Sequence, residues 1–328
     1  MTQTKSVRAM VMASTGDPDV LKESMVELPA MGGADVHLKV LAAGFNPIDT
    51  KIRSGLAPIA PESGILGCDV CGEVLAIGDD VADLTVGDRV FGFIGGAKHL
   101  SGALAEEVVV SRNLITLAPT SWTPEQVAIL PVTGITAVES LERLNLDGQK
   151  ALLILGASGG VGQFAVQIAA AKGLKVTGTA GTPARCEKVK ALGATEALLH
   201  SELTSLSADG QGFDRVFDTF GGESLARALE LASPYGQIVT INARGQHELS
   251  AAHAKSLTLS AIFIIIPLLT AGMSNKGHIE CLNSLAAMID AGKIAAPEIE
   301  VLPATRVGEV HRRYEAGELK NRVAFVWS

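Results

Sequence analysis

The sequence predicts an α/β protein in which a doubly wound parallel sheet is inserted into a partly antiparallel β-barrel domain. Between residues 123 and 267, strand-like and helix-like segments alternate, as in a parallel sheet covered by helices on both faces. The first 120 residues alternate short apolar runs with Gly, Pro and Asp turns, which is typical of an antiparallel barrel. The tail has the order strand, helix, strand, and we expect it to return to the first domain.

A glycine-rich turn after an apolar strand is the most informative motif. The strand 151–155 runs into Gly-Ala-Ser-Gly-Gly-Val-Gly at 156–162, followed by a helical segment to residue 172. Residues without a Cβ let the backbone curl tightly and approach a pyrophosphate, which the helix N-terminus then faces. A second strand at 175–179 completes the βαβ unit that this motif requires. We predict dinucleotide binding by Gly156, Ser158, Gly159, Gly160, Val161 and Gly162; the alternative is a glycine turn that binds nothing.

The end of the second strand indicates which dinucleotide is bound. An NAD site usually has Asp or Glu about 20 residues beyond the glycines, but residues 177–185 contain no acid. They contain hydroxyls, including Thr179, and then Arg185, whose guanidinium can bind a 2′-phosphate through two parallel hydrogen bonds. The pattern favours NADPH, with Thr179 and Arg185 as cofactor-binding residues. The alternative is that Arg185 and Lys188 are solvated charges on a helix face.

The predicted elements define two domains. A capping Thr123 with Pro124 and Gln126 indicates a helix start, so we place the nucleotide-binding domain at residues 123–267. The catalytic domain then comprises residues 1–122 and 268–328. Strands are expected at 36–41, 71–77, 89–93, 105–110, 151–155, 175–179, 197–199, 215–218, 237–241, 299–302 and 322–326, and a helix at 304–316.

Composition excludes several classes of protein. The 328 residues are 47% hydrophobic and carry a net charge of −8 with no basic block, which argues against a nucleic-acid partner. Four scattered cysteines cannot form a disulfide framework, and the N-terminus lacks an apolar signal core, so we expect a cytoplasmic protein. The apolar run 257–269 is too short to span a bilayer and is broken by Pro267, which indicates a buried strand or a subunit contact.

Seven motifs in register resemble the zinc-independent quinone oxidoreductase branch, the zeta-crystallin-like proteins, of the medium-chain dehydrogenase/reductase superfamily. The resemblance covers nearly the whole chain and implies a GroES-like catalytic domain and a Rossmann domain. The first motif is Ala-Ala-Gly-Phe-Asn-Pro-Ile-Asp-Thr-Lys-Ile-Arg-Ser-Gly at 42–55. The others are Gly-Cys-Asp-Val-Cys-Gly-Glu-Val at 67–74, Val-Gly-Asp-Arg-Val-Phe at 86–91, Gly-Ala-Leu-Ala-Glu at 102–106, Pro-Val-Thr-Gly-Ile-Thr-Ala at 131–137, the turn at 156–162, and Phe-Asp-Thr-Phe-Gly-Gly at 217–222.

The resemblance also bears on metal binding. Zinc alcohol dehydrogenases of the superfamily have Cys where this chain has Asn46, and Gly-His-Glu where it has Gly-Cys-Asp at 67–69; their four-cysteine lobe is missing. A catalytic zinc needs three protein ligands around an open position, and that set is lacking here. We predict no metal site and interpret Cys68 and Cys71 as buried core thiols rather than a metal or redox pair.

Without a metal Lewis acid, a conjugated acceptor is the better substrate, because its carbonyl delocalises the charge. In the resembled family the Asn-x-x-Asp pair lies near the nicotinamide. Asn46 and Asp49 are therefore the predicted catalytic residues, with Asn46 facing the carbonyl or the cofactor. Asp49 could instead cap a helix or pair with Arg53. Thr133 is a predicted nicotinamide contact together with Thr136, unless their hydroxyls bond their own helix turn.

The predicted function is NADPH-dependent hydride transfer to a quinone or an α,β-unsaturated carbonyl, without zinc. An alcohol dehydrogenase of the same fold and a non-enzymatic, crystallin-like cofactor-binding protein are the alternatives. In the resembled family the sheet extends across a two-fold axis, so we expect a homodimer that uses the segment 257–269. Close relatives in the family carry tyrosines where this chain has Lys51 and Ala57, which leaves the proton donor open.

Overall fold

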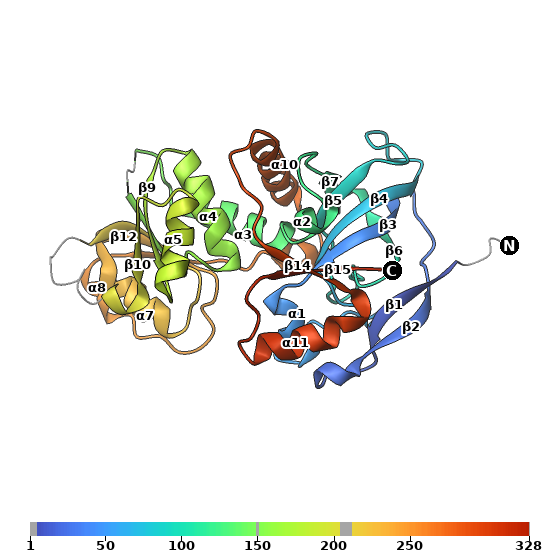
Figure 1. The fold of residues 1–328 in the computed structure, drawn as a ribbon, viewed down its shortest axis with the longest axis horizontal. Helices are drawn as coiled ribbons and strands as arrows, with labels where there is room; N and C mark the ends of the chain where they lie inside the picture. The colour runs from blue at the N-terminus through green and yellow to red at the C-terminus, as the bar shows by residue number, and fades with distance from the viewer. Residues whose placement is uncertain (1–4, 149–150, 204–211, 328) are drawn as a thin grey trace. The chain divides into compact units, whose positions relative to one another are not determined.

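The computed structural model describes residues 5–148, 151–203 and 212–327. The chain forms two compact units (Figure 1). Unit 1 consists of Met1–Val132, Ile265–Asp290 and Ala296–Ser328, and unit 2 consists of Thr133–Ile264 and Ala291–Ala295.

Unit 2 contains the predicted parallel sheet. Its six strands lie in the order β10-β9-β8-β11-β12-β13, and every neighbouring pair is parallel. The sequence therefore predicted the class of sheet and, within a few residues, five of its strands. The strands are β8 (Ala151–Leu155), β9 (Lys175–Ala180), β10 (Glu196–Leu199), β11 (Phe213–Asp218), β12 (Ala232–Thr240) and β13 (Thr258–Ala261).

Helices of unit 2 pack along this sheet. α4 (Gly160–Ala171) contacts β8 and β9, α5 (Pro183–Ala191) contacts β9 and β10, and α7 (Glu223–Leu231) contacts β11 and β12. The other α-helices in the described part of unit 2 are the long α3 (Pro131–Arg143), which crosses the boundary between the units, and the short α8 (Ser250–Ala254). Leu153 and Val216 on the strands and Leu229 on α7 belong to one buried cluster, and burial of such side chains is the main stabilising contribution.

Unit 1 is built on a mostly antiparallel sheet with the order β14-β15-β3-β4-β5-β7, in which β6 also pairs with β3. A separate hairpin, β1–β2, completes its strands. The structure adds β1, β2 and β7 to the predicted strands; β2 was not predicted because most of its side chains are exposed, without the apolar alternation of a half-buried strand. The strands are β1 (Ser6–Met12), β2 (Leu21–Glu27), β3 (Asp35–Gly44), β4 (Asp69–Ile77), β5 (Arg89–Phe93), β6 (Glu107–Ser111), β7 (Ile115–Leu117), β14 (Ile299–Pro303) and β15 (Arg322–Val326).

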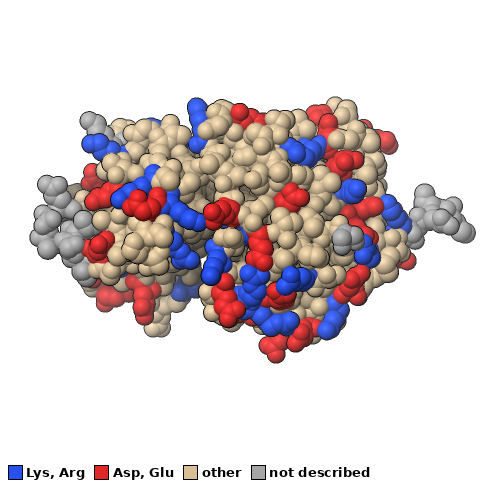
Figure 2. All heavy atoms as spheres, in the orientation of Figure 1, with Lys and Arg blue, Asp and Glu red and all other residues tan. Residues whose placement is uncertain are grey.

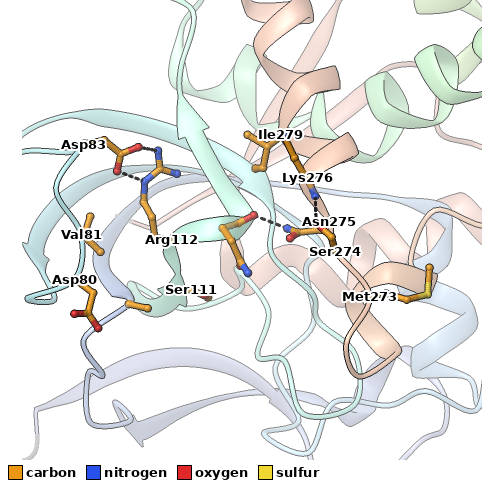
Figure 3. A pocket seen from close by; sticks show the side chains of 12 residues that line it. Asp80, Val81, Asp83, Ser111, Arg112, Met273, Ser274, Asn275, Lys276 and Ile279 are labelled. Carbon is orange, nitrogen blue, oxygen red and sulfur yellow. Dashed lines mark hydrogen bonds and ion pairs between the residues drawn. The ribbon is translucent and has the colours of Figure 1, made fainter.

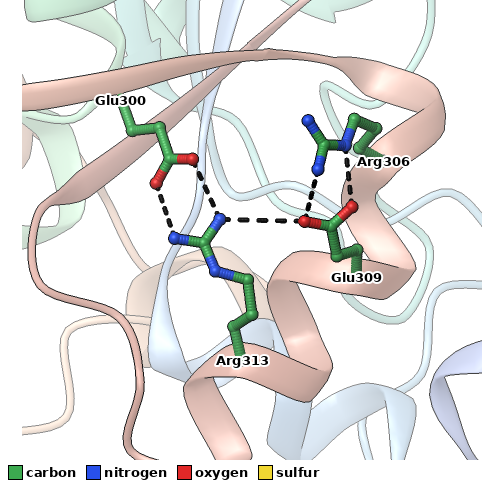
Figure 4. A network of polar contacts seen from close by, with 4 residues as sticks. All are labelled: Glu300, Arg306, Glu309 and Arg313. Carbon is green, nitrogen blue, oxygen red and sulfur yellow. Dashed lines mark hydrogen bonds and ion pairs between the residues drawn. The ribbon is translucent and has the colours of Figure 1, made fainter.

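The C-terminal segment joins this sheet through β15, which pairs with β3. Between β14 and β15 lies α11 (Val307–Glu315), preceded by the 3-10 turn η4 (Ala304–Arg306). Figure 4 shows the ion pairs that tie this helix to β14: Arg313 donates to both carboxylate oxygens of Glu300 at 2.9 and 2.8 Å. Arg306 forms a similar fork with Glu309. These groups are partly solvated, so the pairs fix geometry more than they add stability.

The first boundary between the units lies after Val132, ten residues beyond the expected position. The helix start was predicted correctly: Thr123 Oγ1 accepts from the backbone N–H of Gln126, whose side-chain oxygen accepts from the N–H of Thr123. The helix that begins there, α2 (Pro124–Ala128), packs against β3, β4 and β15 of unit 1. Its partners, not its position in the chain, decide to which unit it belongs.

The apolar segment 257–269 separates into the edge strand β13 and the short helix α9 (Ile266–Leu269). Over the described ranges, no helix combines the length and the apolar character needed to cross a bilayer. On the face shown in Figure 2, acidic and basic side chains are interspersed. The other helices of unit 1 are α1 (Pro47–Arg53) and α10 (Lys276–Asp290).

Candidate active site

The glycine turn of unit 2 has two positions, Gly156 and Gly162, that favour glycine strongly. Gly156 follows β8 directly and has φ of +77°. A Cβ at this position would lie 2.3 Å from Oγ1 of Thr219, and a Cβ at Gly162 would lie 2.3 Å from the carbonyl oxygen of Gly156. The chain therefore passes from β8 into α4 along a path that has no room for side chains at these two positions.

The start of α4 is suited to bind an anion. Gly159 is the residue before the helix and Gly160 is its first residue. The first N–H groups of an α-helix have no acceptor within the helix, and the helix dipole makes this end positive. Gln163 braces the turn by donating from Nε2 to the carbonyl oxygen of Ser158 at 2.9 Å. The space kept free by the glycines and these N–H groups fit the pyrophosphate of a dinucleotide.

Thr179 lies in β9 and Arg185 lies in the following helix, α5, and the two side chains have different surroundings. Thr179 is 0% exposed, and its Oγ1 accepts from the N–H of Gly156 at 3.0 Å. Thr179 therefore holds the glycine turn to the end of β9. Arg185 is exposed in the first turn of α5, which Thr182 caps by accepting from the N–H of Arg185 at 3.3 Å. The guanidinium can therefore reach a ligand in solvent.

Three further residues surround this end of the sheet and were not predicted as site residues. His200 lies with Nδ1 3.1 Å from Thr179 Oγ1, and its ring meets that of Phe220 edge-on at 5.4 Å. Asp218, at the end of β11, is 0% exposed and accepts from the N–H groups of Phe220 and Gly221. Asp218 thereby fixes the loop that presents Phe220. The motif at 217–222 was a signal for Asp218, but nothing local pointed to His200.

In unit 1, Asn46 is the centre of a buried polar network. It precedes α1 and is 0% exposed. Its Nδ2 donates to Oδ2 of Asp69 at 2.8 Å, and its Oδ1 accepts from Arg322 at 3.2 Å. Asp69 also accepts from the N–H of Val132, and Arg322 donates to the carbonyl oxygen of Ile129 at 3.0 Å. Both ends of the Asn46 amide are therefore engaged by the protein.

Asp49 caps the start of α1, which was one of the two structural alternatives to a catalytic role. Its Oδ2 accepts from the backbone N–H of Asn46 at 2.8 Å, and Cys68 Sγ lies 3.6 Å from its Oδ1. Burial raises the pKa of Asp49 to about 6, against the hydrogen bond from Asn46. The alternative pairing with Arg53 does not form, since Arg53 binds Glu315 and the carbonyl oxygen of Gly16.

The carboxylates of Asp49 and Asp69 and the guanidinium of Arg322 belong to the same buried polar network. Burial raises the pKa of Asp69 well above its usual range, while the bond from Asn46 and the charge of Arg322 oppose that shift. Burial lowers the pKa of Arg322, and both carboxylates act in the opposite direction. A buried cation with a carboxylate partner avoids the large cost of an isolated buried charge. Arg322 was predicted only as the start of a strand, because its partners are 276 and 193 residues away in the chain.

Two predicted threonines and two predicted core thiols are buried, whereas Ser158 and Val161 of the glycine turn are partly exposed. Thr133 and Thr136 are 3% and 7% exposed on α3, and both make polar contacts. Cys68 and Cys71 are 0% exposed, and burial raises the pKa of Cys71 to about 12. Thiols in this state are inert core side chains. Over the described residues, no group of three or more His, Cys, Asp or Glu could hold a metal ion.

A pocket of about 480 Å³ opens elsewhere on unit 1, beside the start of α10 (Figure 3). The charges that line it are mostly paired: Arg112 donates to both carboxylate oxygens of Asp83 at 2.9 and 2.6 Å. Asn275 donates to the carbonyl oxygen of Asn113 at its rim. None of the predicted site residues lines this pocket, so we do not assign it to the active site.

Two protein families match this chain. Residues 32–120 match the alcohol dehydrogenase GroES-like domain, and residues 160–276 match the zinc-binding dehydrogenase family. Quinone oxidoreductase from Rattus norvegicus is 35% identical over 256 residues, which cover 75% of this chain and 76% of that protein. An NADPH-dependent alkenal/one oxidoreductase of Arabidopsis thaliana is 34% identical over 72% of this chain and 63% of its own length.

Solved structures give the same result over the full length. An alcohol dehydrogenase superfamily protein from Novosphingobium aromaticivorans is 32% identical, with a TM-score of 0.89 over 99% of this chain and 100% of its own. Quinone oxidoreductase from Coxiella burnetii is 27% identical, with a TM-score of 0.83 over 99% and 100%. The glycine turn, the two sheets and these similarities lead to one conclusion: the chain belongs to the medium-chain dehydrogenase/reductase superfamily and resembles its zinc-independent quinone oxidoreductases.

Proposed function

We propose that this oxidoreductase uses NADPH to reduce a quinone or an α,β-unsaturated carbonyl compound without zinc. The observation that carries the proposal is the segment from the end of β9 into α5, which contains the exposed Arg185 and has no acid between residues 177 and 185. A guanidinium there attracts a 2′-phosphate, and no carboxylate repels it. The names of the quinone and alkenal/one oxidoreductases to which the chain is similar support the substrate class.

The proposed cofactor contacts lie in unit 2. The N–H groups at the start of α4 bind the pyrophosphate, and Thr179 holds the turn by its bond to Gly156. Arg185 binds the 2′-phosphate. When bound, the cofactor supplies the hydride, and the protein contributes position and electrostatics. Thr133, at the start of unit 2, is a proposed nicotinamide contact.

The proposal of a metal-free reaction rests on the residue types of unit 1. Zinc is held by side chains such as thiolate or neutral imidazole that offer it a free electron pair. The amide of Asn46 is instead hydrogen-bonded to Asp69 and Arg322. A conjugated acceptor needs less Lewis-acid assistance than a simple ketone, since its charge spreads over the π-system. We propose that Asn46 and Asp49 position the loop that enters α1 at the active site.

An NADPH-oxidation screen tests this function. The acceptors are quinones, enones, aldehydes and simple ketones, each with NADPH and with NADH, and the same sample is analysed for metals. We expect turnover with quinones or enones, a preference for NADPH, well under one zinc per chain and activity that survives chelators. Alcohol-dependent NAD(P) reduction with stoichiometric zinc would establish an alcohol dehydrogenase instead. Cofactor binding without turnover of any acceptor would favour a crystallin-like role.

We further propose a cytoplasmic homodimer joined through β13. This strand ends the sheet of unit 2, and its outer N–H and C=O groups have no neighbouring strand within the described chain. An unpaired edge invites a second copy to continue the sheet. Phe263 beside it is 48% exposed, which adds apolar surface to the proposed contact.

A further inference from the structure

The side chain of His200 lies beside the end of β9, near enough to Arg185 for that cation to act on the ring. His200 begins a short 3-10 turn (η3, His200–Glu202) after β10. Its ring is held from two directions: Thr179 Oγ1 lies 3.1 Å from Nδ1, and Phe220 packs edge-on at 5.4 Å. A Cβ at Gly181 would lie 3.9 Å from Nε2, so the ring also covers that glycine. His200 is therefore a positioned residue although it is exposed.

The bond to Thr179 is compatible with both charge states of the ring. The Thr179 oxygen already accepts from the N–H of Gly156. A hydroxyl has two lone pairs and one hydrogen, so it can donate to a neutral Nδ1 or accept from a protonated one. When Nδ1 accepts from Thr179, and also when the ring is charged, Nε2 carries a hydrogen, and over the described residues Nε2 has no hydrogen-bond partner. This N–H is available to a ligand.

The charges around the ring oppose its protonation in the free protein. Burial and the positive charge of Arg185 on α5 both lower the pKa of His200. Lys188 is a second cation on that helix. The nearby carboxylates are already engaged: Glu202 accepts from the N–H of Leu199, and Asp218 accepts from the loop after β11. A dianionic group placed at Arg185 would cancel this repulsion and favour the imidazolium.

We propose that His200 is a second, proton-dependent determinant of 2′-phosphate recognition, which works beside Arg185. On binding, the ring takes one proton from solvent, and Nε2–H donates to the phosphate. Discrimination between NADPH and NADH is then greater in mildly acidic solution than in alkaline solution. The inference rests on the proposed NADPH site, because it requires the 2′-phosphate to lie at the end of β9.

Equilibrium binding of NADPH and NADH to the wild type and to His200→Gln tests the inference. Gln keeps a neutral amide donor but cannot be protonated. We expect His200→Gln to bind NADPH about tenfold more weakly than the wild type near pH 6, and within about twofold of it near pH 8.5. NADH binding should be equal for both proteins at both pH values. His200→Gln measures how the phosphate's own titration affects binding when no imidazole is present.

A spectroscopic measurement gives a second readout without turnover. In ¹⁵N-histidine NMR, the His200 signal is identified as the one that is missing in His200→Gln. The pKa that this signal reports should rise by about one unit when 2′-AMP is added and should stay unchanged when 5′-AMP is added. His253→Gln, an exposed change on α8, is the matched control and should retain the wild-type behaviour. An unmoved His200 signal, or equal pH profiles for wild type and His200→Gln, would overturn the inference.

The two proposals fail in different ways. If the wild type prefers NADH at every pH, the cofactor part of the proposed function is wrong, and the inference fails with it. If the wild type prefers NADPH but His200→Gln has the same preference at both pH values, Arg185 acts alone. Only the inference about His200 is then wrong.

Discussion

The side-chain amide of Asn46 donates to Asp69 at 2.8 Å, and neither residue is exposed to solvent. The sequence predicted that Asn46 faces the substrate carbonyl or the cofactor. Its burial within a polar network predicts that it also contributes to stability. Asn46 stands at the entry to α1. Its amide is bonded to Asp69 of β4 and to Arg322 of the last strand, β15.

We predict that Asn46→Ala destabilises the protein by about 2–4 kcal/mol, because it leaves Asp69 and Arg322 without one buried partner each. Urea unfolding measures this, with the exposed Asn113→Ala as control. At a temperature where the variant is folded, kcat/KM should fall by about 10- to 1000-fold if the network positions the active site. Unchanged stability would contradict the buried network, and unchanged turnover would remove Asn46 from the site.

A second prediction concerns the pH dependence of stability at Asp49. Its pKa is raised to about 6 by burial, so the native state favours the protonated carboxyl. The stabilisation is complete below the unfolded pKa and is lost as the pH rises through about 6, by about 3 kcal/mol in total. Asp49→Asn should remove this loss. The difference in unfolding free energy between the two proteins should grow from about pH 4 to pH 6. Parallel curves would show that the pKa of Asp49 is the same in the folded and unfolded states, which would refute the prediction.

The pH dependence of stability that we predict for His311 has the opposite sign. It is 0% exposed, neither ring nitrogen has a hydrogen-bond partner among the described residues, and burial lowers its pKa to about 3. Its contribution to stability is complete above the unfolded pKa and falls as the pH drops below about 6.5, by about 2 kcal/mol at pH 5. His311→Phe keeps a ring against Phe45, 5.4 Å away, and should abolish that loss. The exposed His99→Gln is the control, and a variant that follows the wild-type profile would refute the prediction.

The assignment of the 2′-phosphate to Arg185 predicts a change of cofactor preference. Arg185→Glu removes a charge-assisted contact and adds a like charge, so NADPH affinity should fall by about 30- to 150-fold while NADH affinity changes little. Lys190→Glu is a matched control, since Lys190 lies on the same helix and pairs with Glu187 at 3.2 Å. Titration of each variant with NADPH and with NADH measures the four affinities that test this prediction. An unchanged preference in Arg185→Glu would mean that Arg185 is only a solvated charge.

The proposed dimer predicts a specific effect of proline on β13. Ile262 donates its N–H to Thr240 of β12, so alternation along the strand directs the N–H of Ala261 to the open edge. Ala261→Pro should therefore prevent a second copy from pairing without breaking the sheet of one chain. Sedimentation at micromolar concentration should show a wild-type dimer and a monomeric Ala261→Pro, with Ala261→Val remaining dimeric. A monomeric wild type would refute the proposal.

The sequence by itself determined the parallel sheet, the glycine turn and the cap at Thr123, because each depends on local chemistry. Gly156 is required by its own φ of +77°, and Gly162 is required by the backbone of Gly156 and Ala157. Strand periodicity also does not depend on distant partners. The family resemblance likewise followed from short motifs in register.

Only the tertiary structure decided what the polar residues do. Asn46 was predicted from its motif, but Arg322, 276 residues later, occupies its carbonyl oxygen and Asp69 occupies its amide nitrogen. His200 joins Thr179 because β10 pairs with β9, a contact between strands that no local pattern encodes. Burial and charge partners set the pKa of a side chain, and both arise only when the chain folds.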